Sequence, residues 1–196
     1  MRAFARGHLA QWGVVALATL TVMVLIGACS GSSPRSKAAT PATRVSPPED
    51  LVLTANDFHS LQSMTKIRGF FVDNRLGHLA ETVRVANSTT GGNYPVGTII
   101  QLVPQEAMVK RRPGFSPASR DWEFFTLKVD AQGTQIARRG GAEVINQFGG
   151  SCTGCHSAAE PRFDMVCEHT HGCAPLPISD AIIAAIQRAD PRPAVP

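Results

Sequence analysis

Hydrophobic residues follow helix-like and strand-like spacings in the first part of the region that begins at residue 51. In 54–64 an apolar residue recurs at every third position, which predicts a short amphipathic helix. Residues 67–72 are almost all apolar and predict a strand. The apolar positions of 76–83 share one helical face and predict a second helix, and the Ile- and Val-rich stretch 97–103 predicts another strand.

The second part of this region predicts a hairpin and a terminal helix. In 122–129, bulky side chains occupy both alternating sets of positions, so we expect a strand that is covered on both faces. A turn at 130–133 leads into 134–138, which completes an antiparallel hairpin. Ser179 and the Asp that follows it cap a terminal helix. The order of these elements predicts an α+β domain.

The N-terminus has the pattern of an export signal. Arg2 and Arg6 precede an uncharged apolar run over 12–26, which is short for a membrane-spanning helix of about 20 residues. A transmembrane anchor is the alternative. The run ends in Leu25-Ile26-Gly27-Ala28-Cys29, which resembles the bacterial lipobox. This resemblance implies that residues 1–28 are a signal peptide and that Cys29 becomes the acylated N-terminus of the mature chain.

Composition divides the mature chain into a tether and one folded domain. Residues 29–50 are rich in Ser, Pro, Thr and Gly, so they predict a disordered tether behind the lipid, and 51–196 form the domain. Removal of the signal peptide lowers the net charge from +4 to +2, which excludes the strong basic field of a nucleic-acid-binding protein. Ser30 after the acylated cysteine favours the outer membrane. We therefore expect a lipid-anchored protein on the periplasmic side of the bacterial cell envelope.

Four cysteines lie in the C-terminal part of the chain, and the first two belong to the sequence Cys152-Thr153-Gly154-Cys155-His156. This is the CxxCH pattern of covalent c-type haem attachment. Two thiols one helical turn apart can each add to a haem vinyl group, and the adjoining imidazole can ligate the iron. We expect one haem c per chain. A thioredoxin-like redox pair and a zinc or copper site are the alternatives.

The second cysteine pair lies in a Cys-x-His-x-His-x-Cys array. Because export places the chain in an oxidising compartment, we expect a disulfide between Cys167 and Cys173, with His169 and His171 as exposed loop residues. The alternative is a metal site, since both cysteines and both histidines are possible ligands.

Several segments between residues 67 and 176 together resemble the cytochrome P-460 family, which includes the cytochromes c′-beta. They are Ile67-Arg68-Gly69-Phe70-Phe71-Val72-Asp73, Tyr94-Pro95-Val96-Gly97-Thr98-Ile99-Ile100, Trp122-Glu123-Phe124-Phe125, the haem pentapeptide, and Phe163-Asp164-Met165-Val166. The resemblance implies a mainly antiparallel β-sheet with flanking helices and one c-type haem, usually in a homodimer. It also implies a five-coordinate iron with His156 as the proximal ligand, and an open opposite side.

One position departs from the hydroxylamine-oxidising members of this family. Those members cross-link a lysine to the porphyrin, and Leu102 stands where that lysine would fall. Lys110 is the nearest lysine, and we expect it to belong to a solvated basic run with Arg111 and Arg112; a cross-link through Lys110 is the alternative. Arg111, Arg112 and Arg120 are candidate partners of the haem propionates, but we expect most of them to be exposed. An apolar Leu102 beside an open iron suits neutral diatomic ligands such as nitric oxide.

Three functions are consistent with these residues. The first is a membrane-tethered monohaem cytochrome that binds nitric oxide or a related small nitrogen species and is redox-active on it. The second is a periplasmic electron-transfer cytochrome with a redox partner protein, in which a sixth ligand fills the iron. The third is a non-haem metal-binding or disulfide-stabilised lipoprotein. The candidate sixth ligands are Met64, Met108, Met165, His59, His78, His169 and His171.

Overall fold

The computed structural model describes residues 50–195, and the predictions for the signal peptide, for Cys29 and for the tether up to residue 49 lie outside them. Six antiparallel strands form one sheet in sequence order: β1 (Thr65–Ile67), β2 (Phe70–Asn74), β3 (Thr98–Gln101), β4 (Glu106–Lys110), β5 (Trp122–Asp130) and β6 (Gly133–Gly140). The helices are α1 (Leu79–Ala86), α2 (Cys152–His156) and α3 (Asp180–Arg188), with 3₁₀ turns η1 (Ala55–Asp57), η2 (Leu61–Ser63), η3 (Pro117–Ser119) and η4 (Pro161–Phe163). The predicted α+β class is confirmed.

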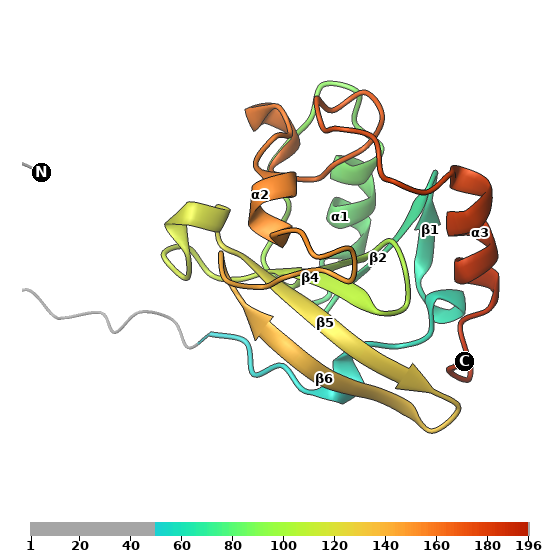
Figure 1. Ribbon diagram of the computed structural model, residues 1–196. Helices are drawn as coiled ribbons and strands as arrows, with labels where there is room; N and C mark the ends of the chain where they lie inside the picture. The colour runs from blue at the N-terminus through green and yellow to red at the C-terminus, as the bar shows by residue number, and fades with distance from the viewer. Residues whose placement is uncertain (1–49, 196) are drawn as a thin grey trace, which may run out of the picture. The chain divides into compact units, whose positions relative to one another are not determined.

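Both faces of the sheet carry a hydrophobic core, because alternate residues of each strand point to opposite sides. Val72, Ile100, Met108 and Phe124 are successive cross-strand partners and form the core on one face. Figure 1 shows α1 and α2 over this face. The other core contains residues such as Phe125 and lies under the N-terminal segment, drawn in cyan in Figure 1. The prediction that β5 is covered on both sides is thus confirmed.

The C-terminal helix α3 lies at the edge of the sheet beside β1 (Figure 1). Ser179 caps it as predicted, because the Ser179 side chain accepts a hydrogen bond from the backbone of Ile182. On α3 the Gln187 side chain donates to the carbonyls of Gly69 and Leu102, at 2.7 and 2.9 Å. These two bonds tie the helix to the β1–β2 and β3–β4 turns.

The helix expected over 76–83 begins three residues later, as α1, and two other predicted elements have a different structure. The helix expected over 54–64 is replaced by η1 and η2, because Asp57 accepts a hydrogen bond from the Thr54 backbone and Ser60 accepts one from the Gln62 backbone. Such side-chain contacts compete with helical hydrogen bonds. The strand expected over 67–72 is instead a hairpin, since Ile67 pairs with Phe70 across a two-residue turn.

Strand β4 has no counterpart among the predicted elements. It contains only three apolar residues between Glu106 and Lys110, and it is fixed by pairing with β3 and β5. No helix between residues 50 and 195 is both long and apolar enough to cross a bilayer.

Candidate haem-attachment site

The residues of the CxxCH sequence form the short helix α2. Ser151 caps it, and its hydroxyl accepts a hydrogen bond from the Gly154 backbone at 3.1 Å. The helical spacing of three places Cys152 and Cys155 on neighbouring positions of one side of the helix. Neither cysteine is in a disulfide, and Cys152 is buried while Cys155 is exposed. Both thiols are thus uncommitted to a disulfide, and that of Cys155 is open to solvent.

His156 is held in a defined orientation at the end of α2. Its Nδ1 lies 2.7 Å from the carbonyl oxygen of Met165, to which it donates, and its ring packs 5.2 Å from the ring of Phe124. Burial lowers the pKa of His156, although the Met165 carbonyl acts in the opposite direction. With the proton on Nδ1, the lone pair of Nε2 is free to ligate a metal, which is the usual arrangement of a ligating histidine.

The Cys152 thiol stays protonated at neutral pH. Burial raises its pKa to about 11, and the nearby Glu106 and Cys155 add to the effect. Burial also raises the pKa of Glu106, against a hydrogen bond from the Gln147 backbone. Sequence reasoning did not single out Glu106, because it lies on β4, which the hydrophobic pattern does not reveal.

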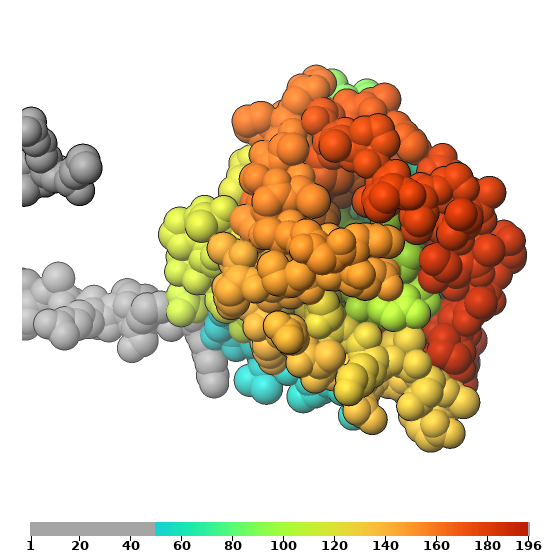
Figure 2. Space-filling model, in the orientation of Figure 1, coloured from blue at the N-terminus to red at the C-terminus, as the bar shows by residue number. Residues whose placement is uncertain are grey.

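Space for a ligand lies between strands β4 to β6 and residues 145–147, which precede α2. A cavity of about 320 Å³ is lined by Gln105, Glu106, Thr126, Leu127, Arg138, Ile145, Asn146 and Gln147. Figure 2 shows a recess between the orange segment that contains α2 and the red segment that contains α3, with green atoms at its floor. These two segments carry large apolar side chains that are 42 to 49% exposed, namely Ile145, Phe148, Leu176 and Ile182. Of these four residues Ile145 lines the cavity, so an apolar group bound there would cover part of its exposed side chain.

The two faces of the sheet separate the candidate sixth ligands. Met108 and Met165 are buried in the core cluster that contains Cys152, and Leu102 packs against that cluster. Met64 packs on the cluster of the opposite face. His78 is exposed at the start of α1. The structure therefore brings Leu102, Met108 and Met165 together with the attachment helix, and it does not do so for Met64 or His78.

Cys167 and Cys173 form the predicted disulfide, with an S–S distance of 2.04 Å. His169 is exposed, as expected, and lies 3.1 Å from Asp180. The expectation that His171 is exposed is wrong. Its ring stacks on Phe163 at 3.6 Å, because the buried aromatic ring and a backbone carbonyl give the imidazole both an apolar and a polar partner. The disulfide removes both thiols from the proposed metal array, and within residues 50–195 no three His, Cys, Asp or Glu side chains group as a metal site would require.

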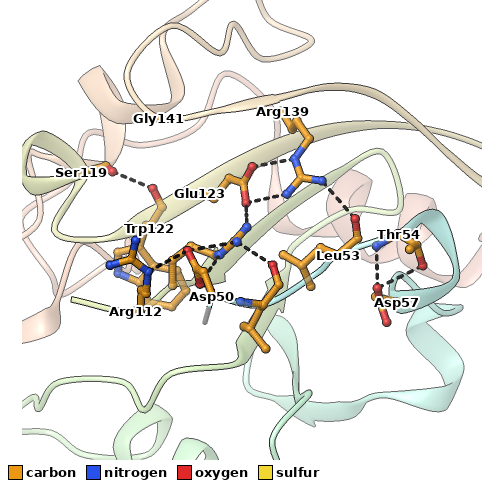
Figure 3. Close-up of polar contacts among 12 residues, drawn as sticks. Asp50, Leu53, Thr54, Asp57, Arg112, Ser119, Trp122, Glu123, Arg139 and Gly141 are labelled. Atoms are coloured by element: carbon orange, nitrogen blue, oxygen red, sulfur yellow. Dashed lines mark hydrogen bonds and ion pairs between the residues drawn. The ribbon is translucent and has the colours of Figure 1, made fainter. Parts of the chain in front are cut away.

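The expectation of a solvated basic run at 110–112 is also wrong. Lys110 is only 11% exposed and pairs with Asp164 at 2.8 Å. Arg111 is buried and pairs with Glu123 and Asp50. Figure 3 shows the surrounding contacts, in which Arg112 also reaches Asp50 and Arg139 reaches Glu123 at 2.7 Å. These arginines tie the N-terminal segment to the sheet on the face opposite Cys152.

No protein-family model, curated protein or solved structure matches the chain. The structure itself describes the chain as an α+β domain. A CxxCH helix packs against the hydrophobic core on one face of its antiparallel sheet. The assignment of a function rests on the chemistry of that helix.

Proposed function

We propose that the protein is a monohaem c-type cytochrome in which Cys152 and Cys155 bind the haem and His156 ligates its iron through Nε2. The observation that carries this proposal is the hydrogen bond from His156 Nδ1 to the Met165 carbonyl beside two thiols outside any disulfide. Each thiol adds across one vinyl group, with sulfur bound to one carbon and hydrogen to the other, so no redox reagent is consumed. The haem supplies an iron that can change oxidation state and bind a small molecule.

The residues around α2 are suited to a porphyrin. Burial lowers the pKa of His156, which favours the neutral imidazole, and this is the form that ligates iron. The exposed side chain of Ile145, which lines the cavity, would lose contact with water against the macrocycle. At about 25 cal/mol per Å² of apolar surface, this burial would add to the covalent attachment.

The iron of this cytochrome binds nitric oxide or a related small nitrogen species on the side opposite His156, and the protein is redox-active on it. Support comes from Leu102, which packs against the core cluster of the attachment helix and offers neither charge nor a hydrogen-bond donor. Cys29 anchors the mature chain on the periplasmic side of the envelope, with the outer membrane as its destination, and the cytochrome forms a homodimer.

The second candidate is an electron-transfer cytochrome with a redox partner protein. It is favoured by the burial of Met108 in the same core cluster as Cys152, since its thioether could fill the sixth position, whereas Met165 lies on the side of the His156 ring that would face away from the iron. The third, a disulfide-stabilised lipoprotein without haem, rests on the Cys167–Cys173 bond alone.

The decisive experiment is production of the full chain in cells that attach haem c, followed by denaturing electrophoresis and a haem stain. Wild type and His169→Ala should retain the pigment, whereas Cys152→Ser/Cys155→Ser should lose it, because only thioether bonds survive denaturation. A colourless wild-type band would refute haem attachment. The ferrous spectrum then separates the first two functions. A high-spin form that takes up nitric oxide at once supports an open site, and an unchanging low-spin form supports electron transfer.

A further inference from the structure

The disulfide-closed segment Cys167–Cys173 has no role in the function proposed above, yet it packs closely against the chain that follows α2. The His171 carbonyl accepts a hydrogen bond from the Glu160 backbone at 2.7 Å. Gly172 has a φ of +91°, and a Cβ added there would lie 3.2 Å from the Ala158 carbonyl oxygen. Cys167 Sγ lies 3.7 Å from the carbonyl oxygen of Cys155. The segment thus contacts the attachment helix at Cys155 and the chain that follows it at Glu160, and it leaves no room for a side chain at Gly172.

The same segment holds residues 163–166 from the other side. The His171 ring stacks on Phe163, with ring planes 4° apart, and its Nδ1 lies 2.6 Å from the Val166 carbonyl oxygen. His171 Nε2 faces Glu168 at 3.5 Å, and Glu168 also pairs with Arg68. Arg68 in turn donates to the carbonyl of Ala86 at 2.7 Å. The segment is therefore anchored to the β1–β2 turn and to the end of α1.

Met165 lies in the chain between Phe163 and Val166, the two residues that His171 contacts. Its carbonyl oxygen accepts the only hydrogen bond that the His156 ring makes within residues 50–195. Its backbone has a φ of +66°, and the preceding Asp164 has a φ of +50°. Two consecutive residues in the left-handed region persist only where the surrounding structure imposes them. The disulfide segment supplies part of that constraint, through His171 against Phe163 and Val166.

We propose that the Cys167–Cys173 segment positions the proximal imidazole, and that reduction of its disulfide weakens the bond between His156 and the iron. The inference rests on the haem function proposed above. A dithiol supplies two electrons and two protons and becomes a disulfide itself, while Cys167 and Cys173 become thiols. The loosened segment then releases Met165, so the His156 Nδ1–H loses its fixed acceptor and the imidazole becomes a weaker ligand. His171 is a positioning residue in this scheme.

The test compares haem-loaded wild type with Cys167→Ser/Cys173→Ser, His171→Phe and the control His169→Ala. His171→Phe keeps the disulfide and the ring on Phe163 but removes the hydrogen bond to Val166. The main measurement is the acid pH at which His156 leaves the iron, followed by absorption spectroscopy. The second is the iron–histidine stretching band of the ferrous protein in resonance Raman spectra. The double variant should hold the imidazole about tenfold less tightly, which raises the acid midpoint by about one pH unit.

His171→Phe should shift both measurements in the same direction by a smaller amount, and His169→Ala should match wild type. If the double variant does not fold, His171→Phe and wild type treated with dithiol decide the question by the same measurements. Unchanged midpoints and bands in a haem-loaded variant would overturn the positioning role alone, as would an equal shift in His169→Ala. A wild type without covalent haem would overturn the proposed function, and this inference with it.

Discussion

Replacing Asp164 by asparagine should lower the free energy of unfolding by about 3 kcal/mol. The Asp164 side chain is 1% exposed, and its oxygens accept hydrogen bonds from Lys110 Nζ at 2.8 and 2.9 Å. It also accepts one from the Tyr94 backbone at 3.0 Å. Asparagine has the same size and tolerates the left-handed φ of +50°, so the substitution removes the charge and leaves the backbone in place.

The magnitude follows from what the substitution leaves behind. Removing one partner of a buried ion pair costs about 3 to 5 kcal/mol, because the other charge stays in a poorly solvated place. Lys110 is 11% exposed and keeps its hydrogen bond to the Arg120 carbonyl at 2.8 Å. Its ammonium also lies 5.1 Å from the centre of the Trp122 ring. These contacts place the expected loss at the lower end of the range.

Urea unfolding of the full chain measures this loss, and Asp180→Asn is the matched control. Asp180 is 76% exposed and pairs with His169 at 3.1 Å on the surface, so the same chemical change there should cost less than about 1 kcal/mol. Asp164 precedes the residue that accepts from His156, so a large effect would show that the pair holds this segment on the sheet. Equal losses in the two variants would refute the reasoning.

Asp190→Asn should reduce the fall in the free energy of unfolding between pH 7 and pH 3. Burial acts to raise the pKa of Asp190, but hydrogen bonds from Arg192 and from backbone groups outweigh it and hold the pKa below the ordinary 3.8. The carboxylate therefore stabilises the fold fully above its ordinary pKa and less as pH falls below it. Urea unfolding at pH 7 and pH 3 should show a smaller difference for the variant than for wild type, and an equal difference would contradict this. Gly91→Ala should cost about 2 kcal/mol or more, since the added Cβ would lie 2.2 Å from the Arg162 carbonyl oxygen at a φ of +85°. Gly114→Ala, with a φ of +86° and no atom within 4 Å, is its control and should cost less in the same assay.

The parts of the fold that sequence reasoning predicted are those encoded locally. The β5–β6 hairpin follows from alternation on either side of a turn at 130–133, and α3 follows from its Ser179 cap and apolar face. Strand β4 was missed, because it is short and is held by its two neighbours in the sheet. The helix expected over 54–64 fails for the opposite reason, since local polar side chains override the apolar spacing there.

The candidate site also combines features that short sequence segments encode with features that depend on the tertiary structure. The spacing of Cys152, Cys155 and His156 and the proximity of Cys167 to Cys173 are properties of short segments, so they were visible in the sequence. The contact between His156 and Met165 depends on the left-handed backbone of Asp164 and Met165. No pattern in the sequence predicts that conformation. Glu106 reaches Cys152 only because β4 lies beside the attachment helix.

The error at Lys110 and Arg111 follows from the missed strand β4. Whereas β6 also pairs with β5 but is largely exposed at the sheet edge, β4 is covered on both faces because it lies between β3 and β5 inside the sheet. Adjacent charges on such a strand point to opposite faces, so each requires a separate buried acid. Lys110 meets Asp164 on the side of α2, and Arg111 meets Glu123 on the other side. A basic run is solvated only where one face of its element is open, so the coverage of the sheet must be decided before its charges are interpreted.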